Sequence, residues 1–173
     1  MPRKAIHPAV RDRIVQLLET NFPGALQKWY EAHGELTLVV DPVRIRSLCV
    51  FLRDHPDLRF DFLSDLTAVD LLGQEPRFVM VYNLFSTTRR HRVRLRAAAL
   101  GDPPSIDTVC DIWLSANWDE RECWDLLGVV FRNHPDLRRI MLHQDWVGHP
   151  LRKDYKTAEE ECYDYLGKRL ADE

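Results

Sequence analysis

The sequence lacks the glycine-rich motifs by which many proteins bind nucleotides. Its seven glycines are isolated from one another, so neither the dinucleotide-binding pattern G-x-G-x-x-G nor a phosphate-binding P-loop can be written. The G-x-S-x-G pattern of serine hydrolases is also absent. We therefore expect that the chain does not bind a dinucleotide or triphosphate by these usual motifs, and that it has no serine nucleophile of the hydrolase type.

Cysteine is scarce and scattered. The four cysteines are Cys49, Cys110, Cys123 and Cys162, and no two form a C-x-x-C pair. Iron–sulfur clusters and structural zinc ions usually take ligands from such local pairs. A disulfide framework is typical of small secreted chains, which this is not. We therefore expect reduced thiols and no metal cluster held by cysteine.

Long apolar runs and an excess of basic charge are missing as well. No run approaches the ~20 residues of a membrane span, and no apolar stretch follows Met1, so we expect no signal peptide and membrane contact only through partners. The 24 basic and 27 acidic residues give a net charge of −3, which argues against nucleic-acid binding. The 173 residues suit a single domain over 1–155 with an acidic tail over 156–173.

Hydrophobic periodicity predicts alternating helices and strands in the first half. Alternating apolar residues predict one strand that includes Leu58, Phe60 and Phe62, and a change of spacing near Ser64 indicates either a bulge or a strand followed by a turn. The predicted elements are helices over 9–20 and 25–31, a strand over 35–40, a helix that begins with Asp41 as N-cap and Pro42, and the strand over 58–69.

The second half continues with two strands and then helices. Arg90, Arg92, Arg94 and Arg96 share one face of the second strand, where they could meet phosphates or an acidic partner; we favour a solvated outer face. The predicted elements are strands over 78–85 and 90–96, helices over 105–113 and 117–128, and a short strand over 129–131. This order predicts an α+β fold, a mainly antiparallel sheet with helices packed on one face and an irregular C-terminal extension.

The stretch from Asn117 to Tyr155 interleaves charged and aromatic side chains. Solvated charge runs lack such aromatics, and core segments rarely hold unpaired Arg or Asp. The stretch is therefore either a catalytic site or a desolvated contact between subunits, rich in Arg and Trp. Among its tryptophans, Trp118 and Trp124 are the ones we expect in the core.

Catalytic interpretations of this stretch have little local support. Glu120 and Glu122 point about 200° apart on a helix and cannot share a site; Glu120 instead fits a capping box with Asn117. Arg121 and Asp125 fit an ordinary i, i+4 ion pair. A metal site built from His134, His143 and His149 with nearby carboxylates, as in a stand-alone metal-dependent enzyme, stays open as the minor alternative, although no pair has the spacing of H-E-x-x-H.

The long ordered motifs of this chain resemble one family. They are Glu120-Arg121-Glu122, Asp125-Leu126-Leu127-Gly128, the run from His134 to Ile140, the run from Gly148 to Tyr155, and upstream Phe60 to Asp70 and Pro76-Arg77-Phe78. In these motifs the chain is similar to the thirty-kilodalton subunit of respiratory complex I, which in bacteria is the C subunit of NADH–quinone oxidoreductase. The resemblance covers roughly residues 35–155; Lys156 departs from it, since many relatives have Pro there.

The resemblance implies a non-catalytic peripheral-arm subunit of a proton-translocating NADH–quinone oxidoreductase, or the equivalent subunit of a membrane-bound hydrogenase or deazaflavin-linked complex. It implies no cofactor in this chain, FMN and iron–sulfur clusters elsewhere in the complex, the large quinone-site subunit as chief partner, and a peripheral place on the cytoplasmic face of the bacterial inner membrane. Arg138, Arg139, Arg152 and Lys153 would meet acidic groups on that partner. The expected partner interface comprises Glu120, Arg121, Glu122, Arg132, His134, Arg138, Arg139, Trp146, His149, Arg152, Lys153 and Tyr155.

Overall fold

The computed structural model describes residues 6–156, so Cys162 and all but Lys156 of the acidic tail lie outside the described residues. The elements are α1 (Pro8–Asn21), β1 (Leu26–Ala32), β2 (Glu35–Val40), the 3-10 turn η1 (Pro42–Arg44), α2 (Ile45–Asp54), β3 (Phe62–Asp70), β4 (Phe78–Phe85), β5 (Arg92–Ala99), β6 (Ser105–Asp107), α3 (Ala116–Leu127) and β7 (Val130–Arg132). None of the helices described between residues 6 and 156 is long and apolar enough to cross a membrane.

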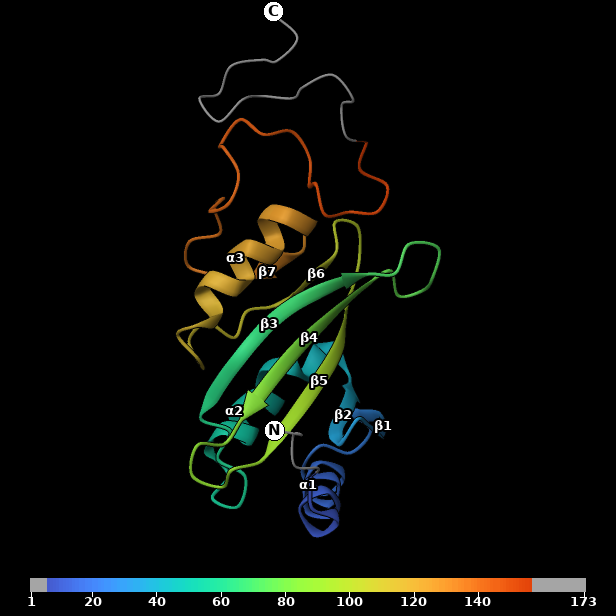
Figure 1. Ribbon diagram of the computed structural model, residues 1–173, viewed down its shortest axis with the longest axis vertical. Helices are drawn as coiled ribbons and strands as arrows, with labels where there is room; N and C mark the ends of the chain where they lie inside the picture. The colour runs from blue at the N-terminus through green and yellow to red at the C-terminus, as the bar shows by residue number, and fades with distance from the viewer. Residues whose placement is uncertain (1–5, 157–173) are drawn as a thin grey trace, which may run out of the picture.

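The main sheet has five strands in the order β1-β2-β5-β4-β3, and a second sheet pairs β6 with β7. Every neighbouring pair in the main sheet is antiparallel except β2 with β5. Figure 1 shows α2 behind this sheet and α3 beside β3, so one broad face of the sheet carries no helix. The α+β prediction is confirmed.

The core follows the alternation of the strands. Leu38 of β2, Tyr82 of β4 and Leu95 of β5 are fully buried on the helix side, where they join one cluster with α1, α2 and α3. The prediction that Asp41 begins the next helix is also confirmed, because its side chain accepts a hydrogen bond from the backbone N–H of Val43 ahead of η1 and α2. Periodicity of two and of 3.6 residues therefore located most of the core correctly.

The predicted helix over 25–31 is wrong, because this segment is strand β1. It pairs with β2 through a two-residue turn at His33-Gly34, whose φ angles of 52° and 77° suit a tight hairpin. The spacing of Leu26 and Trp29 resembled a helical stripe, but Trp29 remains 39% exposed. Pairing across the hairpin outweighs so short a helical pattern.

The predicted helix over 105–113 is also wrong. Ser105–Asp107 forms β6, which pairs in parallel with β7, and turns follow it. Ile106, Val109 and Trp113 are buried as the helical spacing predicted, but from an irregular segment. Three apolar positions at that spacing do not distinguish a buried helix from a buried loop.

Strand β3 confirms a bulge near Ser64, since its register against β4 shifts between Leu63 and Asp65. The strand begins only at Phe62, however, and Phe62 is 49% exposed although the alternation predicted it on the buried side with Phe60. The bulge inserts one residue between Leu63 and Asp65, so the buried positions shift from Leu63 to Leu66. Phe60 precedes the strand and therefore lies outside its alternation.

Helix α3 covers the free edge of β3. The Ser115 hydroxyl donates to the Leu63 carbonyl at 3.4 Å, and the Cys123 thiol lies 4.0 Å from the Leu66 carbonyl. These two side chains, about two helical turns apart, therefore contact backbone carbonyls of β3 that would be exposed if the edge strand were uncovered.

The structure contradicts one of the two tryptophan predictions and agrees with the cysteine prediction. Trp118 is 63% exposed, so its predicted place in the core is wrong, while Trp124 is partly buried against the core. Cys49, Cys110 and Cys123 are buried and free, as expected of reduced thiols.

The row of arginines on β5 is only partly a solvated face. Arg94 bonds to Glu35 at 2.5 Å and to Asn83 at 2.9 Å, and Arg96 donates to the Tyr30 hydroxyl at 3.3 Å. Arg92 is exposed, and Arg90 lies in the preceding turn and not in the strand. Cross-strand partners therefore hold the two central arginines against the sheet.

Candidate subunit interface

Helix α3 places Glu120 inside the molecule, not at a capping box. The helix begins at Ala116 with Ser115 as N-cap, so Glu120 lies beyond the position that reaches back to a cap. Its carboxyl group is fully buried and accepts from the Val109 N–H at 2.7 Å and from the Thr108 hydroxyl. The capping-box prediction is wrong because the helix begins ahead of the predicted cap, Asn117.

Glu120 lies in a polar cluster under α3. Burial raises the pKa of Glu120 to about 7, and the Nε2 atom of His134 is 3.9 Å from its carboxylate. The Nδ1 atom of His134 accepts the Asp136 N–H at 3.0 Å, which places the ring proton on Nε2, facing the Asn117 carbonyl at 3.3 Å. Burial also lowers the pKa of His134, so the ring is neutral at pH 7.

This cluster is the one group with metal-ligand chemistry found among residues 6–156. Potential ligand atoms of Cys110, Glu120 and His134 lie within 4.8 Å of one another. The predicted trio of His134, His143 and His149 does not gather. Because both ring nitrogens of His134 are committed to backbone partners, no lone pair is free for an ion, and the donor set fits a metal poorly.

Asp125 anchors the segment over residues 133–156, which we call the C-terminal segment. Its fully buried carboxylate accepts from the N–H groups of Ile140, Met141 and Leu142 at 2.8–3.0 Å and from Arg139 at 2.5 Å. Burial opposes ionisation, but these donors outweigh it and lower the pKa of Asp125.

The predicted ion pair between Arg121 and Asp125 is therefore wrong. Asp125 faces inward to the C-terminal segment, and Arg121 is buried and donates to the carbonyls of Arg138 and Arg139 at 3.1 and 3.2 Å. Spacing of i, i+4 allows an ion pair, but both side chains instead satisfy the backbone of a segment without regular structure.

Three of the predicted interface residues fasten the C-terminal segment to the end of α3. Arg139 also donates to the carbonyls of Trp146 and Gly148 at 2.8 and 3.2 Å. His149 contacts the Asp125 carbonyl at 2.8 Å, and Arg152 donates to the Leu127 carbonyl at 2.7 Å. The last two bonds use carbonyls left free where the helix ends.

Gly128 makes this docking sterically possible. Its φ of 74° ends α3 in the left-handed conformation, as the sequence predicted. A Cβ atom there would lie 2.3 Å from Nη2 of Arg152 and 2.5 Å from Cδ2 of His149. The position therefore needs glycine for its backbone angle and also for space.

A second anchor lies where the β3–β4 turn meets the end of the C-terminal segment. Arg77 binds Asp70 through two bonds of 2.9 and 3.0 Å and binds Asp154 at 2.6 and 3.0 Å. Asp70 also accepts the Lys153 N–H at 2.9 Å, and Arg77 holds the pKa of Asp70 below its usual value. Local sequence patterns did not predict this anchoring role for Asp70, Arg77 and Asp125, although charged residues beside apolar strand or helix positions were a signal that could have indicated it.

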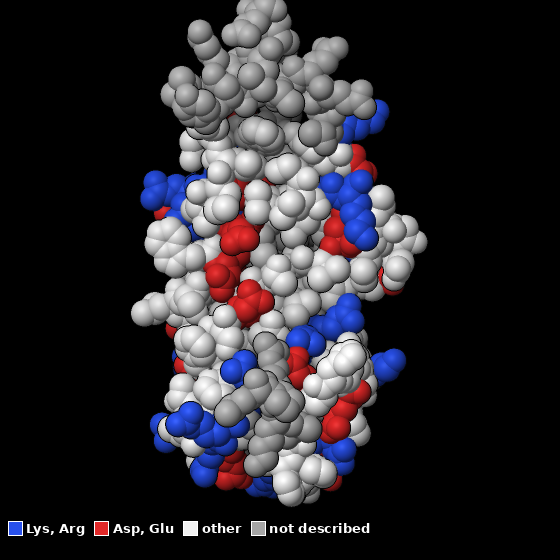
Figure 2. Space-filling view, viewed as in Figure 1, with Lys and Arg blue, Asp and Glu red and all other residues white. Residues whose placement is uncertain are grey.

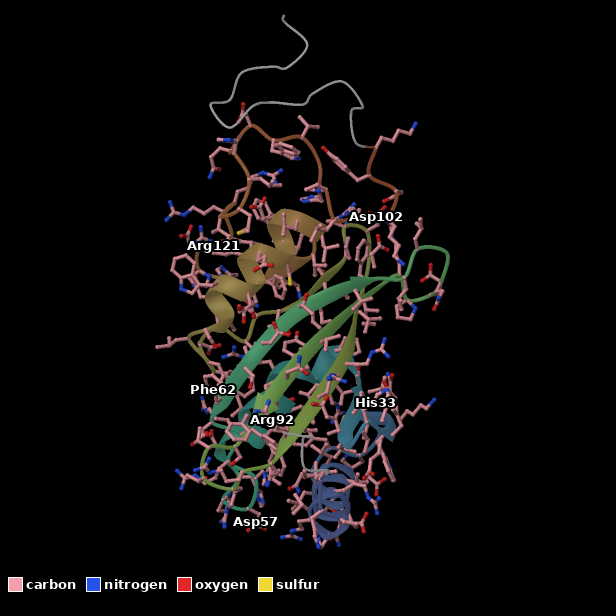
Figure 3. All side chains as sticks on the ribbon, viewed as in Figure 1. His33, Asp57, Phe62, Arg92, Asp102 and Arg121 are labelled. Atoms are coloured by element: carbon pink, nitrogen blue, oxygen red, sulfur yellow. The ribbon has the colours of Figure 1, made fainter. Side chains whose placement is uncertain are left out.

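The predicted interface residues thus divide into two groups. Glu120, Arg121, His134, Arg139, His149 and Arg152 are buried or half-buried and are engaged within the chain. Glu122, Arg132, Arg138, Trp146 and Lys153 are exposed, and Tyr155 is half-buried with its hydroxyl on the Val147 carbonyl. Figure 3 shows the side chains of α3 and the C-terminal segment interleaved at one end of the molecule, with Arg121 among them.

Comparisons with known proteins agree with this architecture. Residues 38–165 match the family described as respiratory-chain NADH dehydrogenase, 30 Kd subunit. The chain is 46% identical to the C subunit of NADH-quinone oxidoreductase from Geotalea uraniireducens, over 92% of this chain and 96% of that one. It is 49% identical to the protein of the same name from Geobacter metallireducens, over 92% and 98%.

Solved structures agree as well. A trypsin-resistant fragment of Nqo5 superposes with a TM-score of 0.59 at 28% identity, over 74% of this chain and 99% of the fragment. A chain of the archaeal membrane-bound sulfane sulfur reductase shares the fold with a TM-score of 0.59 at 20% identity, over 84% and 85%. The chain therefore belongs to the family of the respiratory-chain NADH dehydrogenase 30 Kd subunit.

Proposed function

We propose that this chain is a non-catalytic subunit of the peripheral arm of a proton-translocating NADH–quinone oxidoreductase. In this role it supports assembly and the quinone-site subunits during electron transfer from NADH to quinone. The observation that carries the proposal is the family match over residues 38–165, in which the charged motif folds the chain's own C-terminal segment. Side chains that are hydrogen-bonded to backbone carbonyls are suited to a scaffold, not to proton transfer with a substrate.

The partner surface that we propose is the outer side of the C-terminal segment, facing the large quinone-site subunit. Met141, Val147 and Leu151 expose 63%, 85% and 58% of their surface there. Arg138 and Lys153 supply cations beside them, since Arg139 and Arg152 are engaged inside the chain. Exposed apolar side chains rimmed by charge are typical of a contact between subunits.

Several finer features belong to the same proposal. FMN and iron–sulfur clusters would be held by other subunits, and the complex would lie on the cytoplasmic face of the bacterial inner membrane, reached through partners. Residues 1–155 would form the single domain and 156–173 an acidic tail. The likeness of fold to a chain of the membrane-bound sulfane sulfur reductase supports one alternative, an equivalent subunit of a related respiratory complex.

Charge reversal at Arg138 tests the proposed surface. The Arg138 side chain pairs with Asp136, and both side chains are at least half exposed, so Arg138→Glu leaves the fold intact. We expect the variant to assemble poorly and to lower quinone reductase activity several-fold, because a buried like charge at an interface is costly.

The matched control is Arg44→Glu, an exposed arginine at the start of α2, away from this segment. Co-purified subunits and membrane activity would be measured for both variants. Normal assembly of the Arg138 variant would contradict the assignment of this surface.

A further inference from the structure

A group of exposed arginines lies at the end of the molecule opposite the C-terminal segment. Two loops and the first residue of β5 carry it. The loops are residues 55–61 between α2 and β3 and residues 86–91 between β4 and β5, and Figure 1 places both near the lower end. Basic side chains gather at the lower left of Figure 2. The members, which we call the arginine patch, are Arg59, Arg89, Arg90 and Arg92.

The two loops are fastened to each other, so the patch is preformed. Arg89 donates to the Pro56 carbonyl at 2.8 Å. Asp61 accepts from the N–H and hydroxyl of Thr87 at 2.8 and 2.6 Å, and the His91 ring contacts the Leu58 carbonyl at 3.1 Å. Binding to such a surface loses little conformational entropy in the loops.

Two members of the patch occupy backbone conformations that arginine rarely adopts. The φ angles of Arg59 and Arg90 are 47° and 59°, in the left-handed region that favours glycine. Such a conformation is unfavourable for a residue with a Cβ atom, because the Cβ atom comes too close to the following carbonyl oxygen. The sequence thus has a long cation at each loop position where glycine would be conformationally cheaper.

The charge of the patch is only partly balanced by nearby carboxylates. Within residues 6–156, none of its four arginines forms an ion pair, although Asp57 and Asp61 interact electrostatically with Arg89 and Arg59. Asp57 bonds to Arg13 and Asp61 to Thr87 instead. The chain as a whole carries a net charge of −3, whereas basic side chains gather at this end (Figure 2). A cluster in which cations outnumber carboxylates attracts an anionic partner.

Aromatic side chains border the patch. The Arg92 guanidinium lies 4.8 Å from the Phe85 ring centroid, and Phe85 pairs across the strands with Phe62, which is 49% exposed. Figure 3 shows Phe62 and Arg92 at the same end of the sheet, above Asp57. Arginine stacked on an aromatic ring beside an exposed aromatic is a combination enriched at protein contacts.

We propose that the arginine patch binds an acidic segment of a second neighbouring protein in the assembly, distinct from the partner of the C-terminal segment. The inference rests on the proposed function for the existence of that assembly and adds a second contact. Asp57 and Asp61 lie among the cations and would repel a uniformly anionic lipid surface, whereas they can set the register of a protein segment. The subunit would then bridge two neighbours along its long axis.

Site-specific crosslinking tests which molecule covers the patch. Arg90→Cys in a Cys162→Ser background is labelled with a maleimide benzophenone, the other three thiols being buried, and the intact complex is irradiated. We expect an adduct with another protein, mapped to a peptide rich in Asp and Glu. Adducts with lipid alone, with residues 157–173 of the same chain, or with nothing would overturn the proposal.

Charge reversal supplies an independent measurement. The double variant Arg59→Glu/Arg90→Glu is compared with Lys28→Glu/Arg44→Glu, which changes two exposed cations elsewhere by the same charge. We expect salt to release the patch variant from the purified complex at roughly half the concentration needed for the wild type, with the control unchanged. Equal release of both variants, or of neither, would contradict the inference. Absence of even the wild-type chain from the complex would instead refute the proposed function.

Discussion

At the scale of single residues, Asp125 shows how a charged motif can serve the fold. Four donors, three of them successive backbone N–H groups, converge on its buried carboxylate. A buried charge is stable only when it is paired and hydrogen-bonded in this way. Asp125 therefore fixes where the C-terminal segment crosses α3, and Arg139 completes the pairing.

Glu120 presents the opposite case, a buried carboxyl group with no cation bonded to it among residues 6–156. Its folded-state pKa of about 7 lies above the ordinary value of 4.5, so folding favours the protonated form. The resulting stability is fully present below pH 4.5 and is lost as the pH rises to 7. Over that window the loss is about 3 kcal/mol, taking about 1.4 kcal/mol per pKa unit.

We predict that Glu120→Gln removes this pH dependence, because an amide cannot ionise. Denaturant unfolding of the full chain at pH 5 and pH 8 would measure it, with Glu122→Gln as the exposed control. Between these pH values the Glu120→Gln variant should gain stability relative to the wild type and the control, since His91 and His149, whose pKa values burial lowers, titrate alike in all three. An equal slope in all three would show that Glu120 is ionised in the folded protein.

At the scale of elements, the C-terminal segment is held in place without helix or strand. Within residues 133–156, besides local turns, the backbone is bonded to side chains of α3 and of the β3–β4 region, namely Asp125, Arg121 and Asp70. Each such bond contributes about 1 kcal/mol, and more where a charge takes part. A few charged side chains thus supply hydrogen bonds to this backbone that a helix or a neighbouring strand would otherwise supply.

Arg77→Gln tests this at the second anchor. Asp70 is almost fully buried and would keep only the Lys153 N–H and weaker contacts, so we predict a loss of about 1–3 kcal/mol, discounted for the partial exposure of Arg77. Trypsin cleavage at Lys153 should become faster. Arg46→Gln is the matched control, since its pair with Asp111 is about half exposed and is worth under ~1 kcal/mol. Equal effects of the two variants would argue against a special role for Arg77.

The sequence correctly predicted the elements in which a periodic pattern of apolar residues extends over many positions. The strands β4 and β5, the helix α1 and the bulge in β3 follow directly from alternation or helical spacing. The failures at β1 and β6 concern short segments, where pairing with another strand decides the conformation. The burial of charged residues such as Glu120 was not predicted, because a local spacing rule, here that of the capping box, also accounted for their positions.

At the scale of the whole molecule, the charged motif gives the subunit a preformed end. Side chains of α3 and of the β3–β4 region hold the C-terminal segment in place, and the exposed apolar residues Met141, Val147 and Leu151 form part of the proposed partner surface. The loops between α2 and β3 and between β4 and β5, which carry most of the arginine patch, lie at the opposite end (Figure 1). The two proposed contact surfaces, one at each end, would suit the chain to join neighbouring subunits.

The most direct measurement is affinity purification of the tagged chain from gently solubilised native membranes, with identification of every co-purifying subunit and assay of quinone reduction. The proposed function predicts recovery of a large quinone-site subunit together with flavin- and cluster-bearing subunits, and NADH–quinone reductase activity in the purified material. Recovery of a hydrogenase or sulfur-reductase set would redirect the assignment to a related complex. Recovery of the chain alone, carrying a stoichiometric metal ion, would contradict the proposed function.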